Sequence, residues 1–488
     1  LDVIEAVFSD PSLAGWDGFG LAIQAYQKRA IEVIDWIDTL AAHHNRRMMV
    51  RLVKGAYWDT EVKRAQERGL DDYPVFTRKA MTDLNYIACA ERMLKARPRI
   101  YPQFATHNAL TVASILERAG GVEGFEFQRL HGMGDALYQH LLNERENLAC
   151  RTYAPVGGHS DLLAYLVRRL LENGANSSFV SVAADPNVPA EILLTRPQNI
   201  IGNAGAARHP KLPMPSDIYA PKRRNSQGVE LGHAATLDEL LAEINSVSAT
   251  KIVAAPKIDG EVFVRSTRAV MSPIDGTTLV GHVSEADATL AEKAMEAAKR
   301  GFRAWDRTPA ATRAIALEKA ADALESQRGL FLHLLQLEAG KTIDDALAEL
   351  REAVDFCRFY AAEARALCGE GEVLPGPTGE DNRLIRRGRG VFVCISPWNF
   401  PLAIFVGQAA AALVTGNTVV AKPAEQTPAM AAAAVALLHA AGVPPASLLL
   451  LGEGLDATGD WSYLPGGTGA DGAHDPHVWM DPRGAELY

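Results

Sequence analysis

The sequence is poor in cysteine and lacks clusters of basic residues. It has 488 residues, five cysteines and a formal net charge of -10. The cysteines are scattered and never form a C-x-x-C pair, which favours a reducing compartment over a disulfide framework and makes the cytoplasm the expected location. No Lys/Arg block provides the electrostatic footprint of a nucleic-acid partner, so we expect no such partner.

Long apolar runs and a leader are also missing. No apolar run reaches the roughly 18 uninterrupted residues that a membrane-spanning helix needs. The first residues, LDVIEAVFSDPSL, lack the charged and apolar regions of a signal peptide. They also lack an initiator Met, so we expect the chain to begin inside a larger protein. With 48% hydrophobic residues, the chain is long enough for about three domains.

Residues 1–185 repeat a pattern of short apolar strand, polar or glycine-rich strand end, and helix. The expected strands lie in GLAIQAYQ, RRMMVRLVKGAYWD, RIYPQFATHN, GFEFQRLHGMG and CRTYAPVGG. Such βα repeats predict a parallel sheet, and five of them are too few to close an eight-stranded barrel. We therefore predict an α/β fold that starts with an incomplete (β/α)8 barrel, its last five strands, in residues 1–185.

Three further regions follow. Residues 186–262 are rich in proline and are expected to form a linker with one helix, in TLDELLAEINSV. Residues 263–451 start with a helical layer and continue as strand–helix–strand–helix–strand, which predicts the N-terminal part of a doubly wound domain. In that part, Thr427 and Pro428 are expected to cap a helix. Residues 452–488 form a Gly-rich, aperiodic tail of unclear origin.

Polar side chains gather at the expected carboxyl ends of the first strands, where α/β barrels carry their reactive groups. They are Arg51, Lys54, Thr106, His107, Asn108, Gln128 and Tyr153. Each alone is equally compatible with ordinary strand-end capping, and their convergence favours a binding site. In the helical stretch LVRRLLENGANSSFV, Arg168 and Arg169 precede Glu172 by about one turn. Two guanidiniums are suited to a carboxylate, and a solvated helix edge is the alternative interpretation.

The segments RLVKGAYWD, YPQFATHN, FEFQRLHGMG and YLVRRLLENGANSSFV resemble the proline dehydrogenase domain of bifunctional proline utilisation A flavoenzymes. The resemblance implies FAD-dependent oxidation of L-proline to pyrroline-5-carboxylate. It implies that proline contacts Arg168 and Arg169 through its carboxylate, and Tyr57, Leu130 and Tyr153 through its ring. It also implies that FAD is held by Gln24, Arg51, Val53, Lys54, Gly55, Ala56, Trp58, Thr106, His107, Asn108, Glu172 and Phe179.

This chain departs from the family pattern in one respect. Three upstream barrel strands of the family, which bring a substrate-contacting lysine and aspartate, cannot be assigned in this sequence. A barrel without them would have two unpaired edges. We therefore expect this chain alone to bind FAD poorly or not at all.

The motifs SPWNFP and AKPAEQTP follow predicted strands, where a doubly wound sheet places its ligand loops. Lys422 and Glu425 have charges suited to a ribose, and Asn399, between two prolines, has an amide suited to an oxyanion. A capped loop is the alternative interpretation of each. Together the motifs resemble the aldehyde dehydrogenase superfamily. The resemblance implies that Asn399 is a catalytic oxyanion donor and that NAD is bound by Ile395, Ser396, Pro397, Trp398, Lys422 and Glu425.

In proline utilisation A this second module oxidises glutamate semialdehyde to glutamate. The family's nucleophilic cysteine and general-base glutamate lie beyond the matching segment, and Cys394, expected inside a strand, is no substitute. We therefore expect no aldehyde oxidation by this chain alone. The resemblance gives proline and glutamate semialdehyde as substrates and FAD and NAD as cofactors. It also allows a quinone or the inner-membrane surface as electron acceptor, and a homo-oligomer.

The tail contains HDPHVWMDP, which is similar to a short signature of periplasmic zinc-transport proteins. The nearby GTGADG does not join a strand to a helix, so we do not expect it to bind a dinucleotide. The tail raises a second hypothesis, a non-catalytic metal-binding or assembly protein built on degenerate enzyme domains. A metal retained through dialysis and lost on His477→Ala would favour it. The first hypothesis, an enzyme of proline-to-glutamate catabolism, assigns no metal ligand.

Overall fold

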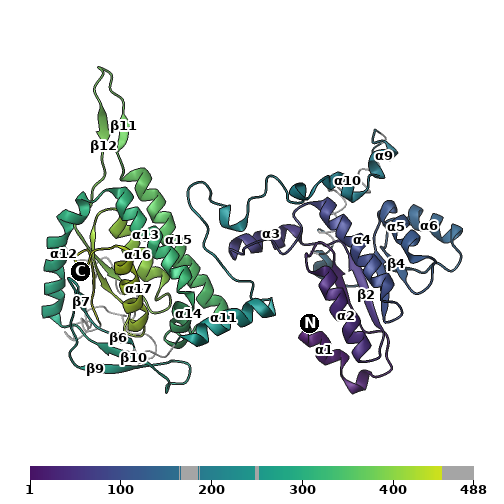
Figure 1. Ribbon diagram of the computed structural model, residues 1–488, viewed down its shortest axis with the longest axis horizontal. Helices are drawn as coiled ribbons and strands as arrows, with labels where there is room; N and C mark the ends of the chain where they lie inside the picture. The colour runs from purple at the N-terminus through teal and green to yellow at the C-terminus, as the bar shows by residue number, and fades with distance from the viewer. Residues whose placement is uncertain (164, 166, 168–184, 186, 248–251, 453–488) are drawn as a thin grey trace. The chain divides into compact units, whose positions relative to one another are not determined.

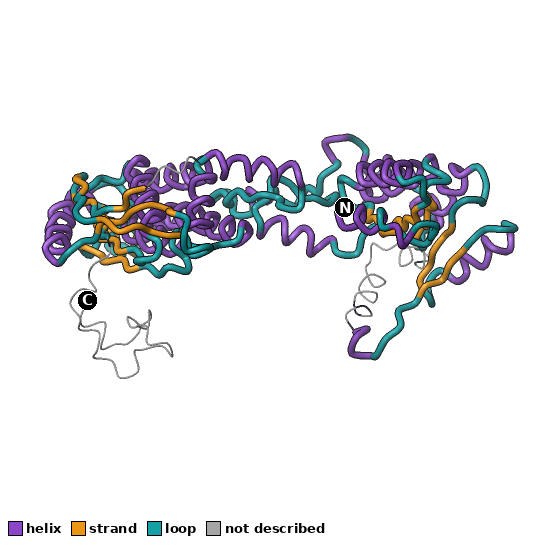
Figure 2. Tube along the Cα trace, turned by 90° about the horizontal axis from the view of Figure 1, so that it is seen from below, coloured by secondary structure: helices purple, strands orange, loops and turns teal. Residues whose placement is uncertain are grey.

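The computed structural model describes all residues except 164, 166, 168–184, 186, 248–251 and 453–488 (Figure 1). The chain divides into two compact units. Unit 1 is Leu1–Glu67 with Asp72–Met214, and unit 2 is Arg68–Asp71 with Pro215–Tyr488. Each unit combines strands with helices, as the colours of Figure 2 show.

Unit 1 is built on one parallel sheet in the order β1-β2-β3-β4-β5. The strands are β1 (Gly20–Gln24), β2 (Met48–Val53), β3 (Ile100–Ala105), β4 (Glu126–Leu130) and β5 (Cys150–Tyr153). The helices in the described part of unit 1 are α1 (Asp2–Phe8), α2 (Ala30–His43), α3 (Trp58–Glu67), α4 (Lys79–Lys95), α5 (Ala109–Ala119), α6 (Asp135–Glu144), α9 (Ala190–Leu193) and α10 (Pro197–Ile201). All five predicted strands are confirmed, and they are five of the eight that a closed barrel contains.

The two faces of this sheet differ because strand side chains alternate with a period of two. In β2, Met48, Val50 and Leu52 are fully buried and pack in one core cluster with residues of α2, α4 and α5. The intervening side chains face the other way. We call that side the inner face; it carries Arg51, Gln103, Glu126, Gln128 and Arg151.

The described residues of unit 2 form three sheets. The main one has the order β13-β14-β15-β7-β8, and the others are β6-β10-β9 and β11-β12. The strands are β6 (Ile252–Ala254), β7 (Lys257–Ile258), β8 (Glu261–Val262), β9 (Thr267–Met271), β10 (Leu279–Ser284), β11 (Glu372–Leu374), β12 (Asn382–Leu384), β13 (Val391–Ile395), β14 (Thr418–Lys422) and β15 (Leu448–Leu450). The helices are α11 (Ala234–Ser246), α12 (Ala288–Arg307), α13 (Ala310–Ser326), α14 (Arg328–Leu337), α15 (Ile343–Leu367), α16 (Ala403–Val414) and α17 (Pro428–Ala441).

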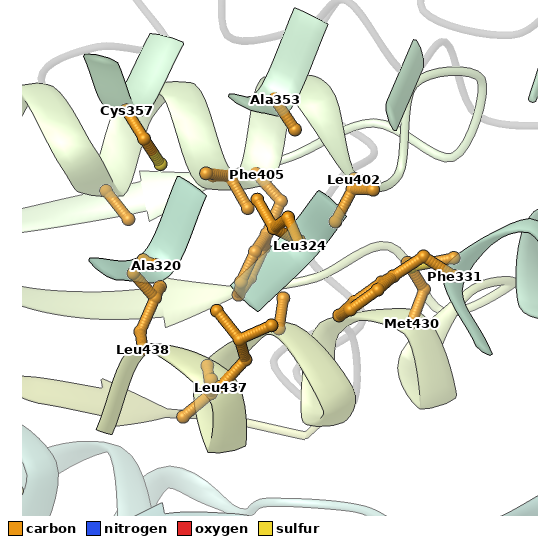
Figure 3. Close-up of a cluster of buried hydrophobic side chains, with 14 of the residues drawn as sticks. Ala320, Leu324, Phe331, Ala353, Cys357, Leu402, Phe405, Met430, Leu437 and Leu438 are labelled. Atoms are coloured by element: carbon orange, nitrogen blue, oxygen red, sulfur yellow. The ribbon is translucent and has the colours of Figure 1, made fainter. Parts of the chain in front are cut away.

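The main sheet of unit 2 is covered on both faces. Val420 of β14 packs in one cluster with residues of α12, whereas Val419 packs in the larger core with α16 and α17. Behind α16 and α17 lies a helical layer of α13, α14 and α15 (Figure 1). Figure 3 shows the core between these layers, where Leu324, Phe331 and Met430 meet from α13, α14 and α17. The predicted doubly wound arrangement is therefore present.

The structure corrects one local prediction and confirms another in position only. Between residues 186 and 262 it has more than one helix: α9, α10 and three short strands accompany α11. The strands β6 and β7 pair with β10 and β15, so partners distant in sequence create order that local periodicity does not reveal. Thr427 and Pro428 do stand at the N-cap and first position of α17, but the Thr427 side chain makes no capping hydrogen bond.

Candidate functional sites

The predicted site residues of unit 1 lie at or just beyond the carboxyl ends of its strands. Gln24 and Val53 end β1 and β2, and Leu130 and Tyr153 end β4 and β5. Arg51 lies two positions before the end of β2. Lys54, Gly55, Ala56 and Tyr57 follow β2, with Trp58 opening α3, and Thr106, His107 and Asn108 follow β3. Parallel strands bring these ends to one edge of the sheet.

A hydrogen-bonded network on the inner face holds Arg51. Its Nε donates to Oε1 of Gln128 (2.7 Å), whose Nε2 donates to Oε1 of Glu126 (2.7 Å). Glu126 is 4% exposed and also accepts from Gln103 (2.9 Å) and, through both carboxylate oxygens, from Arg151 (2.8 and 2.9 Å). Burial raises the pKa of Glu126, but these donors outweigh it and leave the pKa below its usual value. Glu126 is thus an anionic anchor.

A second charged pair lies beside the loop after β2. Lys54 Nζ pairs with Asp83 of α4 and lies 5.9 Å from the ring centroid of Tyr86. Burial lowers the pKa of Lys54, and the Asp83 carboxylate opposes that shift. Tyr86 in turn donates to the carbonyl of Leu52 (3.2 Å). The ammonium is therefore fixed at the end of the strand.

The loop from Gly55 to Trp58 has a conformation that depends on glycine. Gly55 has φ +136°, and a Cβ there would come within 2.4 Å of the Tyr26 ring. The next N–H, of Ala56, donates to Oε1 of Gln24 (3.3 Å). Tyr57 and Trp58 are 47% and 40% exposed, and Trp58 Nε1 donates to the Phe76 carbonyl (2.9 Å). The loop presents aromatic surface beside the polar strand ends.

The loop after β3 is held by its own polar groups. Asn108 caps α5 by accepting from the Thr111 N–H (3.1 Å), and its N–H donates to Oγ1 of Thr106 (3.2 Å). The Leu130 N–H donates to Nε2 of His107 (3.2 Å), which connects this loop to the end of β4. Asn108 therefore has the capping role that was the alternative interpretation, and His107 joins two strand ends.

Four predicted residues lie outside the part of the chain that the structure describes. They are Arg168, Arg169, Glu172 and Phe179. The tail motif with His477 also lies outside it. Their predicted contacts remain predictions.

In unit 2 the predicted nucleotide residues flank two adjacent parallel strands. Ile395 of β13 pairs with Lys422 of β14, and the Ser396 N–H donates to the Lys422 carbonyl (3.1 Å). We call residues 395–402 the Asn399 loop and residues 422–428 the Lys422 loop. Pro397 is half-buried, Trp398 is 49% exposed and Asn399 is also exposed. The loops therefore begin side by side at the carboxyl edge of the sheet.

The polar groups of the two loops fit a nucleotide in part. The Ser396 side chain is 5% exposed, and its Oγ has no hydrogen-bond partner within the described chain. Lys422 Nζ lies 3.6 Å from Oε2 of Glu425, so the two charges are near each other, and Arg268 donates to the Glu425 carbonyl (2.9 Å). An unsatisfied hydroxyl and a partly exposed ion pair at 3.6 Å are groups that a polar ligand would satisfy.

Sequence reasoning missed the carboxylates behind these loops. Glu349 of α15 is 1% exposed, and its Oε1 accepts from the N–H groups of Leu402 (2.8 Å) and Ala403 (3.1 Å). Its Oε2 lies 2.7 Å from Nζ of Lys341. A signal was present, because Glu349 interrupts the apolar face of α15 between Ala346 and Ala353.

Glu338, next to the end of α14, accepts hydrogen bonds in the same way from the backbone at the end of the Lys422 loop. It is 3% exposed, and its two oxygens accept from the N–H groups of Ala429 and Met430, both at 2.7 Å. Burial raises the pKa of Glu338 to about 7, although the two N–H donors lower it. The site therefore holds a carboxyl group that titrates near neutrality.

The remaining features limit the chemistry. Cys394 is confirmed inside β13, is 5% exposed, and has a pKa that burial raises to about 11. Such a thiol is a poor nucleophile. Within the described ranges, His, Cys, Asp and Glu side chains form no cluster arranged to hold a metal ion. In the same residues, no helix combines the length and the apolar character needed to cross a bilayer.

Comparisons with known proteins agree with both halves of the fold. Residues 1–182 match the model of the proline dehydrogenase family, and residues 263–460 match that of the aldehyde dehydrogenase family. Bifunctional protein PutA of Klebsiella aerogenes is 47% identical over 465 residues, which are 92% of this chain and 34% of that protein. A crystal structure of proline utilization A from Bradyrhizobium japonicum matches with a TM-score of 0.82 and 60% identity, over 93% of this chain and 43% of that one.

The second half also has separate relatives. A 1-pyrroline-5-carboxylate dehydrogenase of Anoxybacillus flavithermus is 42% identical over 188 residues, which are 38% of this chain and 36% of that protein. The chain spans about a third of the length of the curated PutA relatives that it matches.

Proposed function

Because the chain carries a proline dehydrogenase domain followed by an aldehyde dehydrogenase domain, and is homologous to bifunctional PutA proteins, we propose that it serves proline-to-glutamate catabolism. Unit 1 would contribute the flavin and proline site and unit 2 the NAD site. The observation that carries the proposal is the convergence of cationic and amide donors at the strand ends of unit 1. A cytoplasmic location, a homo-oligomer, and a quinone or the membrane surface as electron acceptor belong to the same proposal and rest on the family resemblance.

The donor set of unit 1 fits FAD. The guanidinium of Arg51, the ammonium of Lys54 and the imidazole of His107 are suited to a diphosphate and to the polar edge of a flavin. FAD, when bound, would accept a hydride from the ring carbon of proline next to the nitrogen. The chain's own contribution is to bind and orient: Glu126 anchors Arg51 through Gln128, and Asp83 holds Lys54.

Substrate binding in unit 1 would use three residues at the strand ends and the two arginines Arg168 and Arg169. Tyr57, Leu130 and Tyr153 would contact the proline ring, and the Arg51 guanidinium lies 5.0 Å from the Tyr153 ring centroid. Arg168 and Arg169 would bind the carboxylate. Two guanidiniums can form paired hydrogen bonds with one carboxylate, which fixes the orientation of a small amino acid.

The loops of unit 2 fit the polar parts of NAD. The unsatisfied Oγ of Ser396 and the Lys422–Glu425 pair offer donors and acceptors for ribose hydroxyls. Asn399, exposed on its loop, is suited to donate from its amide to a substrate oxyanion of glutamate semialdehyde. NAD, when bound, would supply the hydride acceptor for aldehyde oxidation. The chain's own residues would position the nucleotide and the carbonyl oxygen.

A flavin titration followed by absorbance tests the assignment of unit 1. We expect saturable but weak FAD binding by the full chain, because within the described residues β1 and β5 each have a strand neighbour on one side only. Lys54→Met should weaken it further, whereas Lys63→Met, at an exposed position of α3, should not. Equal affinities in both variants would contradict the site, and tight stoichiometric FAD binding would contradict the expected weakness.

A further inference from the structure

The Asn399 loop and the Lys422 loop each lead into a helix whose N-cap side chain, in the described structure, does not cap it. Leu402 precedes α16 and Thr427 precedes α17, and among the described residues neither side chain makes a capping hydrogen bond. The first N–H groups of a helix have no acceptor within that helix. Because both helix starts are buried, their N–H groups need acceptors from elsewhere in the fold.

At the Asn399 loop, that acceptor is half of an ion pair. Glu349 accepts from Leu402 and Ala403 through one oxygen and pairs with Lys341 through the other. Lys341 Nζ lies 4.3 Å from the ring centroid of Phe400, the residue after Asn399. The pair therefore contacts the loop at two points. Lys341 lies over the aromatic ring next to Asn399, and Glu349 accepts from the backbone that follows.

At the Lys422 loop the acceptor is a single carboxylate. Glu338 accepts from Ala429 and Met430, one N–H for each oxygen. The bidentate geometry fixes the first turn of α17, and the loop that carries Lys422 and Glu425 ends at that turn. The two carboxylates come from neighbouring parts of the helical layer, Glu338 from the end of α14 and Glu349 from α15.

We propose that Glu349 with Lys341, and Glu338, are positioning residues that set the backbone of the Asn399 loop and the Lys422 loop for nucleotide binding. This inference rests on the proposed NAD site. Burying charges is costly, and apolar residues of similar volume would often fill such places without loss of stability. Here the two buried glutamates lie where each determines the start of a helix and the end of a ligand loop.

The test compares Glu349→Gln and Glu338→Gln with a matched control, Glu296→Gln, at an exposed position of α12. Each full-length variant is followed by hydrogen exchange of segments 395–403 and 422–430, and by calorimetric titration with NAD+. Glu349→Gln should speed exchange about tenfold in the first segment only, and Glu338→Gln in the second only. Each should weaken NAD+ binding about tenfold, and the control should change neither.

The outcomes separate the possible failures. A purely structural role predicts faster exchange throughout unit 2 and unchanged affinity of the folded fraction, which would overturn the proposal. Exchange patterns equal to the control would also overturn it. If the unaltered chain does not bind NAD+, the proposed function fails, but the segment-specific exchange still decides the positioning role.

Two variants of Lys341 test the proposal independently, in case the glutamine variants do not fold. Lys341→Met keeps the aliphatic stem and leaves Glu349 as acceptor for the N–H groups of Leu402 and Ala403, but it removes the cation from both Glu349 and Phe400. It should loosen segment 395–403 and weaken NAD+ binding, and Lys341→Arg should restore both. Failure of arginine to restore them, with methionine impaired, would indicate loss of packing rather than of the ion pair.

Discussion

The two units hold their candidate site residues in different ways. In unit 1, side chains on the inner face hydrogen-bond to one another, and Arg51 is fixed by its neighbours in the same surface. In unit 2, the candidate residues lie on loops. Buried carboxylates accept hydrogen bonds from the backbone N–H groups where these loops end. Substitutions on the inner face of the sheet should therefore weaken ligand binding by unit 1. In unit 2, substitutions of buried carboxylates that do not touch the ligand should weaken binding.

The largest effect is expected from Glu349→Ala. It leaves the Lys341 ammonium and two helix N–H groups without their partner, and breaking a buried ion pair in this way costs about 3–5 kcal/mol. Denaturant-dependent hydrogen exchange of the full chain should show this loss in segment 395–403, with unit 1 segments unchanged. A loss below 1 kcal/mol would remove the contrast between the units.

The next effect concerns pH and Glu338. Its pKa is about 7 in the folded state, whereas an unburied glutamate has an ordinary pKa of 4.5, so the folded state binds more protons between these values. The free energy of unfolding of unit 2 should therefore fall as pH rises from about 4.5 to 7, and the contribution should be constant above that. The change attributable to this group is on the order of 3 kcal/mol.

Glu338→Gln provides the control for this pH dependence. The variant cannot ionise, so its stability curve should lack the decline between pH 4.5 and 7. Chemical denaturation at a series of pH values measures both curves. Parallel curves for the two proteins would assign the dependence to other groups.

A smaller effect is expected in unit 1 from Glu126→Gln. The variant replaces one of the two carboxylate oxygens with an NH2 donor, which faces the Arg151 guanidinium in either orientation of the amide and should cost about 1–3 kcal/mol. It should also release Arg51 and lower FAD affinity. Flavin titration and thermal unfolding measure the two effects, with Glu123→Gln, exposed near the start of β4, as the control. Unchanged FAD affinity with reduced stability would show that the network does not reach the site.

The smallest effect on stability is expected from Lys422→Met. The Lys422–Glu425 pair is partly exposed and 3.6 Å apart, and such pairs contribute below about 1 kcal/mol. NAD+ affinity should nevertheless fall, because Lys422 is one of the residues proposed to bind the ribose hydroxyls. Thermal unfolding and calorimetric titration would measure the two. A large loss of stability without loss of affinity would place Lys422 with the structural charges.

Much of the fold was predictable because its signals are local. Apolar segments with polar or glycine-rich ends predicted β1 to β5, and the helical layer expected at the start of residues 263–451 is observed as α12 to α15. The additional strands β6, β7 and β8 were not predictable, because segments of two or three residues are too short to show periodicity and depend on their pairing partners.

The candidate sites divide along the same line. The sequence by itself determined which residues follow each strand, and therefore that Lys54, His107, Asn399 and Lys422 would lie at carboxyl edges. Only the tertiary structure decided that Glu126 anchors Arg51 and that Glu349 caps the helix starting at Ala403. A hydrogen bond between residues 54 positions apart depends on how helices pack, and no local pattern of side chains encodes that packing.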